Sequence, residues 1–185
     1  MRWCAVLMFV GALAIAQGAS AASKPAPNGC HWQAIPELKA HLAVPDGWRF
    51  EQVKSEEALI YEVRPTGKGF EESKAVFHLE VRLRTAPDDA VARARAFVES
   101  ARATAIDAPP LEEQQVSTLT FFSCFVRYPA LGEGLPTLTA AVSSAANART
   151  GTIYTTRFDI PEDEIERVAP LGNALFREWR LDDEV

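Results

Sequence analysis

Polar side chains that can bind anions or transfer protons alternate with apolar side chains over residues 76–84. The polar members share one side of an extended chain and are His78, Glu80, Arg82 and Arg84. The apolar members share the other side and are Phe77, Leu79, Val81 and Leu83. A strict period of two predicts a half-buried strand, most simply paired antiparallel with its neighbours. Together with Arg127, the polar members could form a concave site for an acidic ligand or peptide, or they could simply face water.

The sequence lacks the motifs of the common catalytic and metal sites. The three histidines, His31, His41 and His78, are far apart in the sequence, and no H-x-x-x-H or C-x-x-C pattern occurs. We therefore predict no metal site. No G-x-S-x-G elbow occurs. Gly67-Lys68-Gly69 lacks the spacing of a phosphate loop and predicts a flexible connection. We therefore expect no cofactor, no metal and no catalytic residue.

Paired carboxylates are plentiful but fall at predicted turns and helix starts. They occur at Glu56-Glu57, Glu71-Glu72, Asp88-Asp89, Glu112-Glu113 and Glu162-Asp163-Glu164. Acids at these places complement helix dipoles and increase solubility. A weak calcium site in the cluster of residues 162–166 stays open as an alternative.

The N-terminal residues have the features of a signal peptide. Met1 and Arg2 lead into an apolar run over residues 5–16, and Ala19-Ser20-Ala21 matches the A-x-A cleavage pattern. The run is too short to cross a bilayer, which takes about 20 apolar residues. We expect cleavage after Ala21, no membrane span afterwards, and a periplasmic or extracellular protein.

Cleavage would leave two of the three cysteines, Cys30 and Cys124. Two cysteines in an exported chain often pair, and a disulfide closing a loop of this length stabilises by up to about 4–5 kcal/mol in the chain-entropy model. We therefore expect a disulfide between Cys30 and Cys124. The alternative is that Cys124 is a small buried apolar residue and Cys30 is a thiol in a mobile tail.

Charge and composition narrow the class of partner and the domain plan. The formal net charge is −6 and becomes −7 when Arg2 is removed with the leader. A net acidic chain without a basic cluster argues against nucleic acid and against anionic membranes. Pro-rich residues 22–31 predict a flexible linker, residues 32–181 a single domain, and residues 182–185 a frayed acidic tail.

The order of predicted elements is strands, a helix, more strands and a second helix. Strands are expected at residues 38–44, 48–53, 58–64, 76–84, 137–145 and 152–158, with one bent strand or a tight hairpin at 112–128. Antiparallel strand pairs with helices between the blocks predict an α+β layered sandwich with a mostly antiparallel sheet.

Both helices are predicted to be amphipathic. Thr85 can cap the first helix, whose apolar stripe is Val91, Ala94, Phe97, Val98 and Ala101. The second begins near Asp159-Ile160-Pro161-Glu162, with Pro170 expected to kink it near Val168. Its stripe is Ile165, Val168, Leu171, Gly172, Leu175, Phe176 and Trp179.

Three stretches resemble the PsbP-like fold. They are Leu42-Ala43-Val44-Pro45-Asp46-Gly47-Trp48, the middle helix over residues 88–100 after an alternating strand, and the strand running into a terminal helix over residues 154–179. The fold is shared by an extrinsic subunit of photosystem II, a Ran-binding import factor and many exported bacterial proteins. The resemblance implies a seven- or eight-stranded antiparallel sheet between helical layers, and no shared activity.

From these features we expect an exported, non-enzymatic binding or accessory domain that acts on a protein partner or small ligand in the cell envelope. Whether the protein is an enzyme stays uncertain, and two alternatives stay open: a hydrolase-like enzyme with a scattered active site, and a structural subunit of an envelope complex. A pocket with convergent titratable groups would favour the enzyme. A large exposed apolar patch would favour the subunit.

Overall fold

The computed structural model describes residues 25–130, 136–177 and 179–180. The predicted signal peptide (1–21), the first residues of the predicted linker and the predicted acidic tail (182–185) lie outside the described residues.

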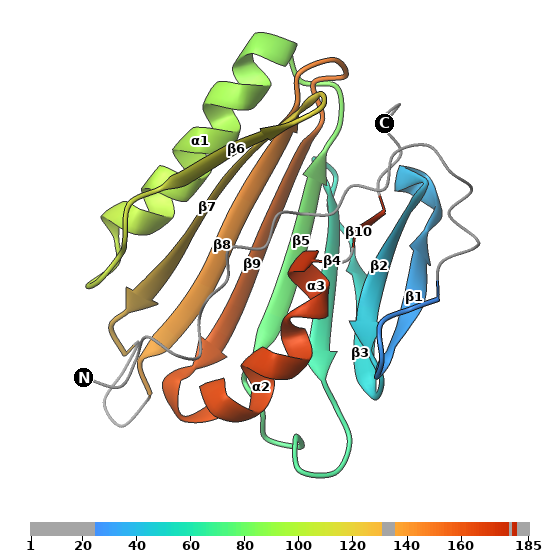
Figure 1. The fold of residues 1–185 in the computed structure, drawn as a ribbon, viewed down its shortest axis with the longest axis vertical. Helices are drawn as coiled ribbons and strands as arrows, with labels where there is room; N and C mark the ends of the chain where they lie inside the picture. The colour runs from blue at the N-terminus through green and yellow to red at the C-terminus, as the bar shows by residue number, and fades with distance from the viewer. Residues whose placement is uncertain (1–24, 131–135, 178, 181–185) are drawn as a thin grey trace.

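The described residues form a seven-stranded antiparallel sheet, a smaller sheet and three α-helices (Figure 1). The large sheet has the order β3 (Trp48–Val53), β4 (Leu59–Pro65), β5 (Val76–Arg82), β9 (Ile153–Pro161), β8 (Leu138–Asn147), β7 (Leu119–Tyr128) and β6 (Glu112–Val116). The small sheet has the order β1 (Cys30–Ile35), β2 (Ala40–Pro45) and β10 (Trp179–Arg180). The helices are α1 (Pro87–Ala103), α2 (Ile165–Gly172), α3 (Ala174–Arg177) and two 3-10 turns, η1 (Pro36–Leu38) and η2 (Glu162–Glu164). The predicted α+β class with a mostly antiparallel sheet is confirmed.

Alternation along the strands divides the large sheet into two faces, each with its own core. On one face Phe77, Phe158 and Tyr61 pack with Leu42 of β2 and Val168 of α2. This first core therefore lies under the small sheet and the C-terminal helices. The second core, on the opposite face, lies under α1 and contains Ala90, Ala94, Val98, Phe122, Cys124, Val126 and Val142.

Helix α1 packs on the sheet through small residues. Ala90, Ala94 and Val98 are completely buried, and their spacing of four places them on one side of the helix. Phe97 is 36% exposed, so its predicted place in the buried stripe is wrong. The short side chains let α1 approach β7 and β8 closely. Arg95, on a neighbouring side of the helix, places its guanidinium 5.1 Å from the centre of the Phe122 ring.

The predicted cap of α1 is also wrong. The helix begins at Pro87 after Ala86, with no side-chain cap. The Thr85 hydroxyl instead donates to the carbonyl oxygen of Gly151. Thr85 therefore fastens the β5–α1 connection to the β8–β9 turn.

The C-terminal segment is less helical than predicted. Pro170 lies inside α2, and the interruption comes later, at Asn173. Trp179 lies in β10, where it pairs with Leu42 of β2, so its predicted place in a helical stripe is wrong. Leu171 is 44% exposed and also lies off the buried side.

Two further differences concern the N-terminal part. Cys30 and His31, assigned to the linker from the sequence, begin β1 and pair with Pro45 and Val44. The strand predicted from Leu38 begins at Ala40, because Leu38 ends η1. At residues 112–128 the hairpin alternative is the one observed, as β6 and β7.

The β4–β5 loop is clamped to the start of α2 by Glu164. Its carboxylate accepts hydrogen bonds from the Ser73 hydroxyl at 2.5 Å and the Lys74 amide at 3.0 Å. Arg167 donates to the same carboxylate at 3.0 Å and lies 4.6 Å from the Phe70 ring centre. Burial raises the pKa of Glu164, but these three hydrogen bonds lower it more, so the net shift is downward.

We expect Glu164→Gln to lower the free energy of unfolding at neutral pH by about 1–2 kcal/mol, because the hydrogen bonds lose their charge. A lowered carboxyl pKa in the folded state stabilises the protein above the unfolded-state pKa, and this stabilisation is lost as the pH falls through the folded value. Urea unfolding of both proteins from neutral to acidic pH should therefore show a difference that shrinks on acidification. A constant difference would contradict the ionic contribution.

Candidate functional site

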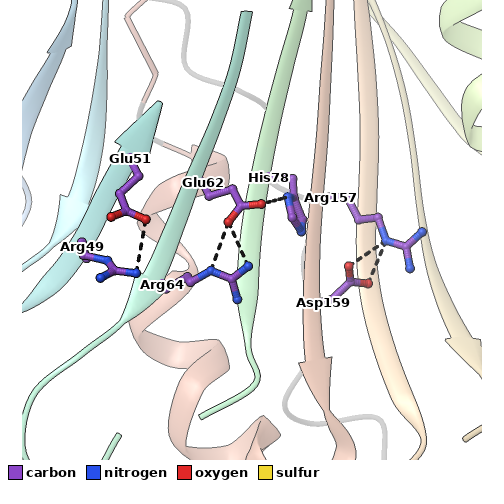
Figure 2. A network of polar contacts seen from close by, with 7 residues as sticks. All are labelled: Arg49, Glu51, Glu62, Arg64, His78, Arg157 and Asp159. Carbon is purple, nitrogen blue, oxygen red and sulfur yellow. Dashed lines mark hydrogen bonds and ion pairs between the residues drawn. The ribbon is translucent and has the colours of Figure 1, made fainter. Parts of the chain in front are cut away.

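Nine charged or titratable side chains gather on the part of the second face that lies beside α1. We call this surface the ionic face, and its members are Arg49, Glu51, Glu62, Arg64, His78, Glu80, Arg82, Arg157 and Asp159. They come from β3, β4, β5 and β9, and Figure 2 shows seven of them side by side on these strands. The main contacts of α1 are with β7, β8 and β9, so the helix leaves side chains of the ionic face accessible to solvent.

The arginine–carboxylate ion pairs of this face run along each strand rather than across the sheet. Residues two apart in a strand lie on the same side. The pairs are Arg49–Glu51 at 3.2 Å, Glu62–Arg64 at 2.8 Å, Glu80–Arg82 at 2.6 Å and Arg157–Asp159 at 2.8 Å. Across β3 and β4, however, Arg49 faces Arg64 and Glu51 faces Glu62. These like-charge neighbours are unfavourable, and the in-strand pairs offset them.

His78 occupies the middle of the face. Its cross-strand neighbours are Glu62 on β4 and Arg157 on β9, and its Nδ1 lies 3.3 Å from Glu62 Oε1. Burial lowers the pKa of His78 below its ordinary value, although Glu62 and Asp159 act in the opposite direction. His78 is therefore neutral at pH 7 and gains its charge only in acid.

The permanent cations of this face are all arginines, each paired with a carboxylate two residues away on its own strand. Arg157 bonds both carboxylate oxygens of Asp159 through Nε, at 2.8 and 2.9 Å, and its guanidinium lies 4.9 Å from the Tyr128 ring centre. Asp159 and Glu62 are only 15% and 21% exposed. The described lysines, in contrast, lie between elements and are Lys39, Lys54, Lys68 and Lys74. Arginine is enriched and lysine depleted at protein interfaces, because a planar guanidinium binds acceptors with little loss of freedom.

The structure brings together three of the five side chains proposed from the sequence. His78, Glu80 and Arg82 share one face of β5, as the alternation predicts. Arg84 lies beyond the end of β5, at a φ of 58°. Arg127 is on the opposite face of the large sheet, because its row across the sheet contains Thr139 and Ile160, and it pairs with Glu162 at 2.9 Å. Arg127 is therefore not part of the same surface.

Six members of the ionic face were missed from the sequence, although a signal was present. Opposite charges separated by one apolar residue occur within four strands of the large sheet: Arg49-Phe50-Glu51, Glu62-Val63-Arg64, Glu80-Val81-Arg82 and Arg157-Phe158-Asp159. In a strand this pattern places an ion pair on one face and an apolar side chain on the other. Its recurrence in four strands indicates one continuous charged surface.

The predicted disulfide between Cys30 and Cys124 is not present in the structure. Cys124 is buried in the second core under α1, whereas Cys30 lies in β1 of the small sheet, which packs on the opposite face. The large sheet therefore separates the two residues, and a bond with normal disulfide geometry would need a backbone rearrangement. The alternative that Cys124 is a small buried apolar residue fits its place.

We expect Cys124 to be almost unreactive in the native protein. Burial raises the pKa of its thiol to about 11, against a smaller opposing effect of Arg102. The thiolate is the reactive form, so two pKa units remove roughly 99% of it at pH 8. In a chain from residue 22 that carries Cys30→Ser, Cys124 should react with a thiol reagent only after denaturation. Equal rates in the native and denatured protein would contradict this.

The opposite face of the large sheet has a hollow between β8, β9 and α2. It encloses about 350 Å³ including its open mouth, and its lining includes Ala141, Phe158, Ile160, Ile165 and Ala169. Its lining has no titratable side chain, so it lacks groups for acid–base chemistry. Among the described residues, no cluster of three potential metal ligands occurs. Within the same part of the chain, no helix is long and apolar enough to cross a membrane.

Comparisons with known proteins give matches at the level of structure. No family model matches the chain, and no curated protein does. LpqN of Mycobacterium tuberculosis, involved in cell envelope biogenesis, superposes with a TM-score of 0.55 at 13% identity, over 77% of this chain and 83% of LpqN. The yeast (Saccharomyces cerevisiae) Ran-binding protein Mog1p gives 0.50 at 9% identity, over 82% of this chain and 95% of Mog1p.

Cyanobacterial PsbP (CyanoP) from Synechocystis sp. PCC 6803 gives a TM-score of 0.50 at 14% identity, over 90% of this chain and 99% of CyanoP. At such low identities the matches establish the architecture alone. They agree with an α+β architecture built on a mostly antiparallel sheet. The chain therefore has a PsbP-like fold.

Proposed function

We propose that this protein is an exported, non-enzymatic binding or accessory domain that binds a protein partner through the ionic face. The observation that carries the proposal is the continuous, arginine-based charged surface on four neighbouring strands, part of which stays open to solvent beside α1. Charge pairs with oriented guanidinium groups supply specificity and steering in protein recognition.

The alternatives are less well supported by the described residues. An enzyme would need a pocket with convergent titratable groups, but the hollow beside α2 has an apolar lining. A structural subunit would expose a contiguous apolar patch, but only five large apolar side chains are exposed among the described residues: Val53, Leu83, Phe97, Ile106 and Leu171. Mog1p is Ran-binding and LpqN is involved in cell envelope biogenesis, and both descriptions are consistent with a binding or accessory module.

The cell envelope as the place of action rests on the leader of residues 1–21. Cleavage after Ala21 would make Ala22 the first residue of the native protein. N-terminal sequencing or intact mass of protein purified from its own cells tests this. An intact Met1 would overturn the export part of the proposal and leave the binding part standing.

The binding part is tested by site-specific crosslinking in the native cells. A photoreactive amino acid at position 57, an exposed site close to Arg82 of the ionic face, should capture a defined partner, and the same amino acid at position 93 on the exposed side of α1 should not. In the first protein, Arg64→Glu should abolish capture, because it places a third acid beside Glu62 and Glu51. The matched charge reversal Arg93→Glu should leave capture unchanged. Equal capture from both positions, or capture that Arg64→Glu leaves unchanged, would contradict the proposal that the ionic face binds the partner.

A further inference from the structure

The ionic face has more hydrogen-bond donors than acceptors to receive them. Each guanidinium carries five N–H groups. Among the described residues, Arg82 uses only Nε on Glu80, and Arg157 uses only Nε on Asp159. Arg64 uses Nε and one terminal nitrogen on Glu62. Terminal N–H groups of all three arginines are left for water or for a ligand.

The central carboxylates, in contrast, are already engaged. Glu62 receives Arg64 on Oε2 and lies 3.3 Å from His78 Nδ1 through Oε1. Both oxygens of Asp159 receive Arg157. The groups still able to bond outward at the centre of the face are therefore mainly donors, and the complementary ligand supplies acceptors.

His78 sets the charge of the face. Four arginines and four carboxylates give +4 − 4 = 0 when His78 is neutral, and +1 when it is protonated. The groups that act on it are Glu62 and Arg64 of β4, Arg157 and Asp159 of β9, with Glu80 two residues along its own strand. The side chain is 35% exposed, so a ligand on the face can approach it.

We propose that the ionic face takes a carboxylate-rich segment of the partner protein and holds it more tightly in acid, when His78 is protonated. This inference rests on the proposed function, because it specifies the partner chemistry and the regulation of the same surface. Arg64, Arg82 and Arg157 donate to the partner carboxylates. The added charge of His78 lies beside Arg157 and strengthens the attraction. Binding of an anion stabilises the protonated histidine, so ligand and proton bind cooperatively.

The test uses the chain from residue 22 and a labelled hepta-aspartate peptide, with hepta-lysine and hepta-serine peptides as comparisons. Fluorescence anisotropy at low and constant ionic strength measures affinity at about pH 5.5 and about pH 7.5, on either side of the histidine range. Only the aspartate peptide should bind, and its dissociation constant should be lower by a factor of about three or more at the lower pH. Aspartate stays ionised over this range, so the peptide itself contributes little to the change.

Three variants separate the inference from other causes. His78→Gln should remove the pH dependence, so that its affinities at the two pH values are equal. Arg64→Gln should weaken binding at both pH values. Arg93→Gln on α1, with the same charge change, should alter neither, and circular dichroism checks that each variant is folded. No binding of hepta-aspartate, or a pH dependence that persists in His78→Gln, would overturn the inference. Crosslinking from position 57 would then still test the proposed function on its own.

Discussion

Replacing Gly151 by alanine is expected to destabilise the protein by about 4 kcal/mol or to prevent folding. This is a larger effect than we expect from alanine at Gly29 or Gly172. Gly151 has a φ of 73°, and an added Cβ would lie 2.8 Å from the carbonyl carbon of Thr85 and closer still to its oxygen. The obstruction is backbone, so no side-chain rotation relieves it. The Thr85 amide also donates to the Gly151 carbonyl at 3.1 Å, and this bond would break as the two segments separate.

This contact connects the fold to the candidate site. Gly151 lies in the β8–β9 turn, and Thr85 lies between the end of β5 and the start of α1. Forcing them apart moves the connection that follows Arg82 of the ionic face and precedes α1. We therefore expect any folded fraction of Gly151→Ala to bind the hepta-aspartate peptide more weakly as well.

Gly29→Ala is the matched control, because Gly29 has a φ of 74° with nothing within 4 Å of an added Cβ. The backbone strain is the same, and the steric overlap is missing. Urea unfolding should show a loss of about 1 kcal/mol for this variant. Equal losses for the two variants would show that the approach of Thr85 contributes nothing to stability.

Most strands of the large sheet could be predicted from the sequence, because the alternation that identifies each strand is a local pattern. Alternation at residues 76–84 fixes which side chains of β5 face the core, whatever strand lies beside it. The same reasoning places Ala140 and Val142 of β8 together, and both are buried in the second core. Turn residues, as at Asp46-Gly47 and residues 147–151, mark where one strand stops and the next begins. The predicted strand ends differ from the observed ends by a few residues.

The candidate site was only partly predictable because it depends on register between strands. His78 and Arg157 are far apart in the sequence, and only the pairing of β5 with β9 makes them neighbours. Arg127 shows the opposite error. It resembles the other arginines in type and in its strand context, but a one-residue difference in phase places it on the other face of the sheet.

The ends of the chain were predicted least well, because long-range pairing there overrides local preference. Trp179 continues a helical spacing from Leu175, but pairing with Leu42 in the small sheet makes it part of a strand. Cys30 follows a Pro-rich segment typical of a linker, and β2 nevertheless provides a partner for it. The disulfide predicted from the pairing habit of exported cysteines is absent because Cys30 in β1 and Cys124 under α1 lie on opposite faces of the large sheet.

Gly172→Ala should destabilise the protein by about 2 kcal/mol, although alanine is the better helix former by about 1 kcal/mol. Gly172 ends α2 where the helix crosses β9, and an added Cβ would lie 2.5 Å from Cζ of the Phe158 ring. Phe158 is 3% exposed and is fixed by Trp48, Phe77 and Phe176, with ring centres 6.0, 6.3 and 6.1 Å away. These three rings restrict the movement of the Phe158 ring, so we expect that either α2 lifts from the sheet or the aromatic cluster repacks.

A double-mutant cycle with Phe158→Leu identifies the cause. Phe158→Leu alone should cost about 2–3 kcal/mol, because it leaves a cavity among the three aromatic rings. In the double variant the methyl group added at position 172 enters part of that space, so the two losses should be less than additive by about 1–2 kcal/mol. Free energies of unfolding from urea titrations of the four proteins give this coupling. Strictly additive losses would mean that Gly172 is required for a reason other than the ring of Phe158.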